Sequence, residues 1–174
     1  FKGGTMDVNT QRSFSHAKLS TSQHKEQFLY RPVQLGTRGT VTRVAYRLLD
    51  DSVAGDYDIT FVMGFATDND LSTSSFSGNL TEQVTVFDGV LSVPAGLKAG
   101  DWFEISLTTS FNYDGERPLV VQSSSPGGTA SNLLSAYCDS PRYDGQFVFD
   151  VIEAPDDTPE DSGSCMLDQR LWFK

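Results

Sequence analysis

Acidic side chains gather in several short stretches, and these are the residues whose types could do chemistry. Asp114 and Glu116 lie in the stretch NYDGERP, and further acids lie in DDSVAGDYD, TDND and EAPDDTPED. Two carboxyl groups across a cleft can hydrolyse glycosides, but no spacing here selects such a pair. Most of these acids lie in predicted turns, where Asp is common because it bonds its own backbone. We therefore predict a non-enzymatic chain with no catalytic residue.

Clustered loop oxygens also suit calcium, which takes about six to eight oxygen ligands. The stretch TDND places Asp68, Asn69 and Asp70 in succession. The EF-hand loop pattern is absent, so two alternatives stay open. Either these three residues bind calcium, or they form an acidic turn in water and the chain has no cofactor.

Nucleophilic catalysis needs a Ser or Cys with a base beside it. The two histidines, His16 and His24, both lie in the polar first part of the chain. The sequence has neither a G-x-S-x-G elbow nor a phosphate-binding Gly-rich loop. These absences weaken most hydrolase and nucleotide-binding interpretations.

The two tryptophans are candidates for glycan binding. Trp102 is out of phase with Phe103 and Ile105, and Trp172 is out of phase with Leu171 and Phe173. In a strand this phase turns both indoles away from the core. Exposed indoles can stack on the apolar faces of sugar rings, so carbohydrate binding, with polysaccharide as the partner, is the alternative to a structural, self-assembling function. The alternative is a second buried layer under a loop.

Three further residues bear on the compartment. Cys138 and Cys165 form an even pair in a Ser- and Thr-rich acidic chain, which fits one disulfide in an oxidising compartment. The alternative is two unpaired thiols in a cytosolic protein. Asn79-Leu80-Thr81 matches the N-glycosylation pattern. We expect an extracellular or cell-surface location.

The charge balance excludes some partners. The chain of 174 residues has 23 Asp and Glu against 13 Lys and Arg, a formal net charge of -10. Such a surface repels phosphate backbones, so nucleic acid is not an expected partner. No apolar run approaches the roughly 20 residues of a membrane helix, so we expect no membrane span.

Period-two alternation dominates from residue 28 onward. YDITFVMGF places Ile59, Phe61, Met63 and Phe65 on one strand face, and TVTRVAYRLL and WFEISL alternate in the same way. Gly, Pro and Asp turn signals separate about ten such runs. We predict an all-β chain, a single β-sandwich of the jelly-roll or Ig-like type over residues 28–174.

Residues 1–27 are polar and read as an N-terminal extension. Such a segment can add as a strand to the sheet edge of a neighbouring copy, a head-to-tail contact that propagates into a filament. Its apolar anchors would be Met6, Val8, Phe14 and Leu19. The alternative is an edge strand on its own domain.

Three stretches together resemble secreted bacterial surface proteins of the PEP-CTERM type and adhesin-like chains. They are QFLYRPVQLGTRGTVTRVAYRL, DLSTSSFSGN with VTVFDGVLSV, and WFEISLTTSFNYDGERPLVV. The resemblance covers about residues 27–122 and rests on the stretch LSTSSFSGN and on a pattern of the form F.YDG. It implies an extracellular β-sandwich without known catalysis. The chain departs from the anchored form because it ends in LDQRLWFK, without an anchor helix.

Overall fold

The computed structural model describes residues 23–48, 51–52, 54–72, 74–126, 138–139, 146–152, 161–163, 166–167 and 169–174. Within these ranges the chain is mostly β, and strands form two main antiparallel sheets. The all-β class predicted from alternation is confirmed. No helix in the described part is long and apolar enough to span a membrane.

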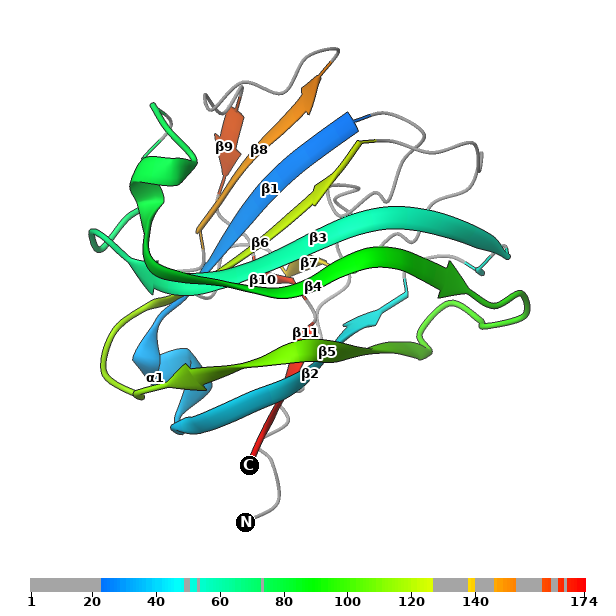
Figure 1. Ribbon diagram of the computed structural model, residues 1–174, viewed down its shortest axis with the longest axis horizontal. Coiled ribbons are helices and arrows are strands. Elements are labelled where there is room, and N and C mark those ends of the chain that lie inside the picture. The colour runs from blue at the N-terminus through cyan, green and yellow to red at the C-terminus, as the bar shows by residue number, and fades with distance from the viewer. Residues whose placement is uncertain are drawn as a thin grey trace.

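The larger sheet has six strands in the order β4-β3-β6-β1-β8-β9. Its strands are β4 (Leu80–Val93), β3 (Gly55–Ala66), β6 (Leu119–Ser125), β1 (Gln23–Tyr30), β8 (Gln146–Ile152) and β9 (Asp161–Gly163). All neighbours run antiparallel. In Figure 1 this sheet forms the upper layer.

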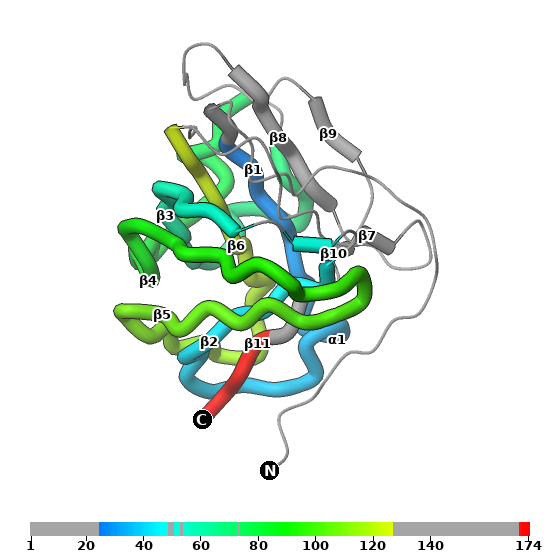
Figure 2. Tube along the Cα trace, turned by 90° about the vertical axis from the view of Figure 1, so that its right-hand side faces the viewer, coloured from blue at the N-terminus to red at the C-terminus, as the bar shows by residue number. Residues whose placement is uncertain are grey.

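The smaller sheet has the order β11-β2-β5, and it lies beneath the larger one in Figures 1 and 2. It comprises β11 (Gln169–Phe173), β2 (Gly39–Arg47) and β5 (Trp102–Tyr113). A short pair joins β10 (Met166–Leu167) to β7 (Cys138–Asp139). The helical pieces are α1 (Pro32–Leu35) and the 3-10 turn η1 (Ser77–Asn79).

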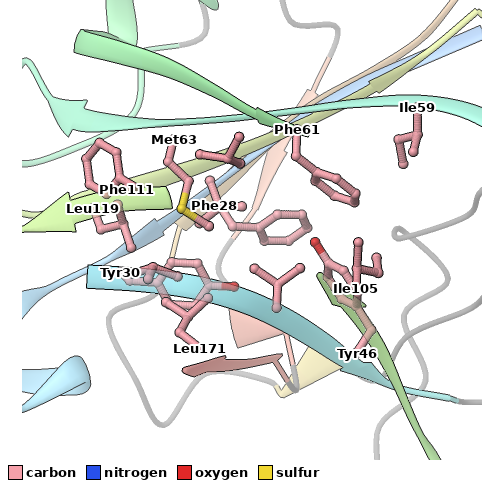
Figure 3. Close-up of a cluster of buried hydrophobic side chains, with 14 of the residues drawn as sticks. Phe28, Tyr30, Tyr46, Ile59, Phe61, Met63, Ile105, Phe111, Leu119 and Leu171 are labelled. Atoms are coloured by element: carbon pink, nitrogen blue, oxygen red, sulfur yellow. The ribbon is translucent and has the colours of Figure 1, made fainter. Parts of the chain in front are cut away.

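The core lies between the two sheets, as Figure 3 shows. The predicted row Ile59, Phe61, Met63 and Phe65 is buried there, because alternate residues of β3 point to one face. Contact across the layers is aromatic: Tyr46 of β2 stacks on Phe61 with ring centroids 6.2 Å apart. These contacts hold the sheets face to face, so their outer faces point in opposite directions.

A second, smaller apolar cluster lies on the outer face of the large sheet. Leu29, Leu80 and Val120 form it, and Leu71 packs against it. Leu71 belongs to the loop between β3 and β4, residues 67–79, in which Phe76 is fully buried. The loop therefore covers one end of this outer face.

The start of β1 corrects the boundary expected from the sequence. Gln23–Tyr30 is an inner strand that pairs with β6 on one side and β8 on the other. The polar segment assigned to an extension up to residue 27 therefore ends by residue 22 at the latest. The proposed anchors Met6, Val8, Phe14 and Leu19 lie outside the described residues. So does Cys165, and of its predicted disulfide partner Cys138 only the backbone in β7, opposite Leu167, is described.

Two glycines allow a matched test of how tightly the backbone packs around Gly39 at one end of the small sheet. Gly39 and Gly89 have nearly equal positive φ, 144° and 146°. A Cβ at Gly39 would lie 2.7 Å from the backbone oxygen of Lys174, whereas a Cβ at Gly89 would meet nothing within 4 Å. Both Gly→Ala changes strain the backbone, but Gly39→Ala should destabilise the fold by about 1–3 kcal/mol more, because of the added clash. Urea unfolding measures this difference, and equal losses would contradict the packing described.

Candidate ligand-binding face

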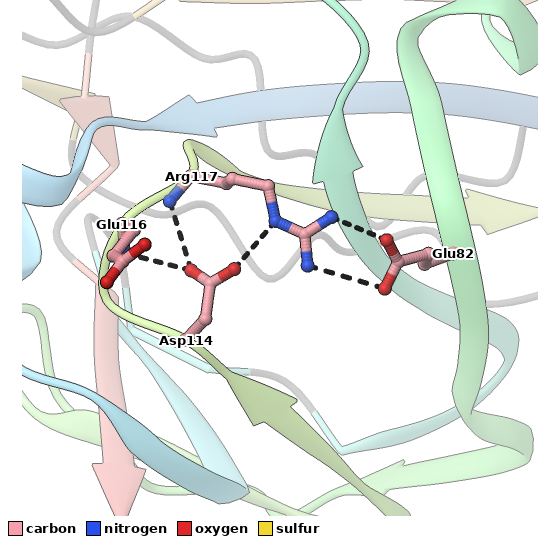
Figure 4. Close-up of polar contacts among 4 residues, drawn as sticks. All are labelled: Glu82, Asp114, Glu116 and Arg117. Atoms are coloured by element: carbon pink, nitrogen blue, oxygen red, sulfur yellow. Dashed lines mark hydrogen bonds and ion pairs between the residues drawn. The ribbon is translucent and has the colours of Figure 1, made fainter.

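The corner between β5 and β6 uses its acids to hold a turn (Figure 4). Oδ1 of Asp114 accepts the backbone N–H groups of Glu116 at 2.8 Å and of Arg117 at 3.0 Å. Its Oδ2 accepts a hydrogen bond from Nε of Arg117 at 2.6 Å. This is a side-chain turn of the kind that Asp favours. The prediction that these acids lie in a turn is confirmed at this corner.

The guanidinium of Arg117 extends the corner to a third strand. It pairs with the carboxylate of Glu82 in β4 and lies 3.5 Å above the ring centre of Phe65. Burial opposes the charged form of Asp114, but the backbone N–H groups of Arg117 and Glu116 and the guanidinium outweigh it, so its pKa is lowered. The hydrogen bond from Arg117 also lowers the pKa of Glu82. Both acids are thus ionised structural partners.

The expected calcium ligands lie on the exposed start of loop 67–79. Asp68 accepts the backbone N–H of Asn69, and Asp70 forms an ion pair with Arg31 at 2.9 Å. The other guanidinium nitrogen of Arg31 donates to the backbone oxygen of Asn69 at 2.7 Å. The guanidinium of Arg31 already pairs with Asp70 and with the backbone oxygen of Asn69, which disfavours a second cation at those two oxygens. Within the described part, no group of three or more His, Cys, Asp or Glu side chains could hold a metal ion.

Asn79, the residue of the glycosylation pattern, is buried at 3% exposure. Its amide nitrogen donates to Oε1 of Gln27 and to the backbone oxygen of Ser72, both at 2.9 Å. Gln27 in turn donates to the backbone oxygen of Phe76 and to Gln122. An amide with both hydrogens engaged inside the fold has no room for a glycan, so the folded chain does not suit the expected modification.

The two tryptophans lie on the same outer face of the small sheet. Trp172 of β11 is opposite Arg43, and Trp102 of β5 is opposite Arg47. Their strand neighbours Leu171 and Phe103 point into the core, so the two indoles lie on the opposite side of the sheet, where they are half-buried. We call Arg43, Arg47, Trp102, Glu104 and Trp172 the Trp/Arg face.

Contacts within the Trp/Arg face are local and exposed. The guanidinium of Arg43 lies 4.9 Å from the ring centre of Trp172 and pairs with Glu104 at 3.1 Å. Their side chains remain 44% and 48% exposed, so this pair adds little stability. Arg47 donates from Nε to the backbone oxygen of Gly100. The face combines flat aromatic surface with guanidinium donors, which sequence reasoning missed because the arginines belong to a different strand from either tryptophan.

One carboxyl group lies inside the fold. Glu26 of β1 is 6% exposed, and its Oε1 accepts a hydrogen bond from Ser123 at 2.8 Å. Burial raises its pKa from 4.5 to about 8, although the bond from Ser123 works in the opposite direction. In the register His24 is opposite Ser125, and Glu26 is opposite Phe149 of β8. The position of Glu26 in the interior makes it a structural acid held in its protonated form at neutral pH.

Comparisons with protein-family models, with curated proteins and with solved structures found no match to this chain.

Glu26 gives the fold a predictable pH dependence. Because its folded-state pKa is above its ordinary value, the folded chain keeps a proton that the unfolded chain releases above pH 4.5. The stability from this group is complete below that pH and is lost as pH rises through about 8, a change on the order of 5 kcal/mol at most. Urea unfolding between these limits should show the decline in the wild type and a smaller one in Glu26→Gln. Glu116→Gln is the exposed control, and an unchanged slope in Glu26→Gln would refute this assignment.

Asn79 gives a test of the loop. Asn79→Ala removes two donated bonds and the bond that its Oδ1 accepts from the backbone N–H of Ser72. Buried groups left unpaired cost about 1–3 kcal/mol each, so stability should fall and amide exchange in residues 67–79 should accelerate. Asn69→Ala, on the exposed part of the same loop, should change neither. Equal effects of the two substitutions would mean that Asn79 does not hold the loop.

Proposed function

We propose that this chain is a non-enzymatic, secreted or cell-surface domain, a jelly-roll or Ig-like β-sandwich, that binds anionic carbohydrate through its Trp/Arg face. The observation that carries the proposal is the position of both tryptophans beside two arginines on one outer sheet face. The outer face of an antiparallel sheet is usually polar. Two tryptophans on such a face therefore suggest a role in binding in addition to packing.

Aromatic and guanidinium groups recognise different parts of such a ligand. An indole offers an apolar face to the C–H surface of a pyranose ring. A guanidinium offers parallel N–H donors that match a carboxylate or sulfate. Arg43 already lies over Trp172, so a sugar acid that binds this guanidinium is brought next to the indole. Uronic-acid or sulfated polysaccharides therefore fit better than neutral ones.

The negative net charge of the chain restricts where an acidic glycan can bind. A chain with net charge -10 repels a polyanion at long range. Binding of an acidic glycan therefore needs cations concentrated on one surface. Arg43 and Arg47 supply two on outward positions of β2, and Arg43 also pairs with Glu104.

Several polar side chains that could take part in catalysis have structural roles instead, which supports a non-catalytic function. Asp114 and Glu82 hold a corner, Asn79 holds a loop, and Glu26 lies between the sheets away from solvent. Each of these groups has a structural partner that explains its position.

Self-association into a filament is the second candidate function. The sequence predicts strand addition by the N-terminal segment, and that route stays a prediction because residues 1–22 lie outside the described part. The opposite charges of the two outer sheet faces favour a different route, in which these faces bind each other.

A titration tests the carbohydrate proposal. Adding polygalacturonate should change the tryptophan fluorescence of the wild type, whereas neutral dextran should not. Arg43→Ala should weaken binding by about tenfold or more, because a charge-assisted hydrogen bond is worth ~1.5–3 kcal/mol. Arg38→Ala, an exposed arginine outside the face, is the matched control. Equal binding of both polymers, or equal binding by the two variants, would count against the proposal.

A further inference from the structure

The outer face of the large sheet carries a charge opposite to that of the Trp/Arg face. Asp56 and Asp58 of β3 are exposed there, and Asp88 of β4 lies on the same surface. Val90, directly opposite Asp58, is 58% exposed. We call Asp56, Asp58, Asp88, Val90 and Ser92 the acidic face.

The charges of the acidic face are not neutralised by any basic side chain among the described residues. Asp56 accepts a hydrogen bond from Ser92 at 2.6 Å, and Asp88 accepts one from Thr60 at 2.7 Å. Both donors are neutral hydroxyl groups, and within the described residues none of the three aspartates forms an ion pair. An apolar side chain surrounded by uncompensated carboxylates is a surface that a basic, aromatic partner would stabilise.

The acidic face is open to such a partner. Loop 67–79 covers the other end of this sheet surface, over Leu29 and Val120. The two sheets face each other across the core, so the acidic face and the Trp/Arg face point away from each other (Figure 1).

The spacing of charges on the two faces matches. Arg43 and Arg47 are four residues apart on β2, about 13 Å along the strand. On the acidic face, Asp56 is opposite Ser92, and Ser92 is four residues from Asp88. Asp56 and Asp88 are therefore also about 13 Å apart along the strand direction. Asp58 and Val90 lie between them. Both rows lie on extended strands of fixed rise, so they can meet without rearrangement.

We propose that the Trp/Arg face of one copy docks on the acidic face of a second copy. The contact is heterologous, because it joins two different surfaces. Each added copy leaves one face of each kind free, so the association propagates into a head-to-tail stack. The partner is thus a second copy of this chain, and residues 1–22 are not required. The inference shares the Trp/Arg face with the proposed carbohydrate binding but needs the acidic face as well.

Charge reversal on either face tests the proposal in the full chain. Sedimentation velocity over a concentration series should show association of the wild type. Arg43→Glu with Arg47→Glu, and separately Asp56→Lys with Asp58→Lys, should each weaken association by about tenfold or more, since close charge pairs at interfaces couple strongly. An equimolar mixture of the two variants should associate again, because each reversed face complements the reversed face of the other.

Matched controls separate specific docking from net charge. Arg38→Glu with Lys174→Glu changes the net charge as the arginine variant does, and Asp68→Lys with Glu116→Lys changes it as the aspartate variant does. All four side chains are exposed and lie outside both faces. These controls should associate as the wild type does.

Several results would overturn the docking. They are a wild type that stays monomeric throughout the series, reversal variants that associate no less than their controls, or a mixture that stays dissociated. Polygalacturonate binding distinguishes failure of the docking from failure of the proposed function. The aspartate variant should keep binding, so binding without association removes the docking alone, and association without binding removes the carbohydrate proposal alone.

Discussion

The structure depends on the burial of two polar side chains in the middle of an inner strand. Glu26 and Gln27 are adjacent in β1, so one points between the sheets and the other points to the outer face. A buried polar group is costly unless it is hydrogen-bonded. Gln27 therefore requires partners from loop 67–79, and these bonds fix the loop over one end of the large sheet. The other end stays open, and the acidic face lies there.

Strands with one buried face could be predicted from the sequence, whereas this inner strand could not. In β3 and β5 the apolar residues of the alternating pattern are the buried ones. The same alternation predicts that Trp102 lies on the opposite face of β5 from Phe103. The segment QHKEQ has no such alternation, because its residues Glu26 and Gln27 are polar but buried, with partners far along the chain. Ser123 lies 97 positions after Glu26, and Asn79 lies 52 positions after Gln27. A three-letter glycosylation pattern likewise contains nothing about the burial of its asparagine.

The patterns behind the family resemblance serve packing in this fold. In LSTSSFSGN, Leu71 packs on the second cluster, Phe76 is fully buried and Asn79 holds the loop. In F.YDG, Phe111 and Tyr113 enter the core, Asp114 closes the turn, and a Cβ at Gly115 would lie 2.8 Å from Arg38 Cβ. Each residue type is required by the local geometry. Such patterns follow the architecture, and they carry no information about a ligand, which is why function has to be argued from the outer faces.

Both proposed partners of the Trp/Arg face are acidic, so they compete for the same guanidinium groups. Two copies with net charge -10 repel each other, and at about 0.1 M salt this repulsion is screened beyond roughly 10 Å. Docking therefore rests on close contacts, in which opposite charges and apolar groups meet after water leaves. A polyanion meets the same long-range repulsion but brings many equivalent groups to one face. Bound glycan would then block the Trp/Arg face of a copy while leaving its acidic face free, so carbohydrate would end a growing stack on one side only. The two functions are linked through one surface, and because the stack is polar, carbohydrate acts on only one of its ends.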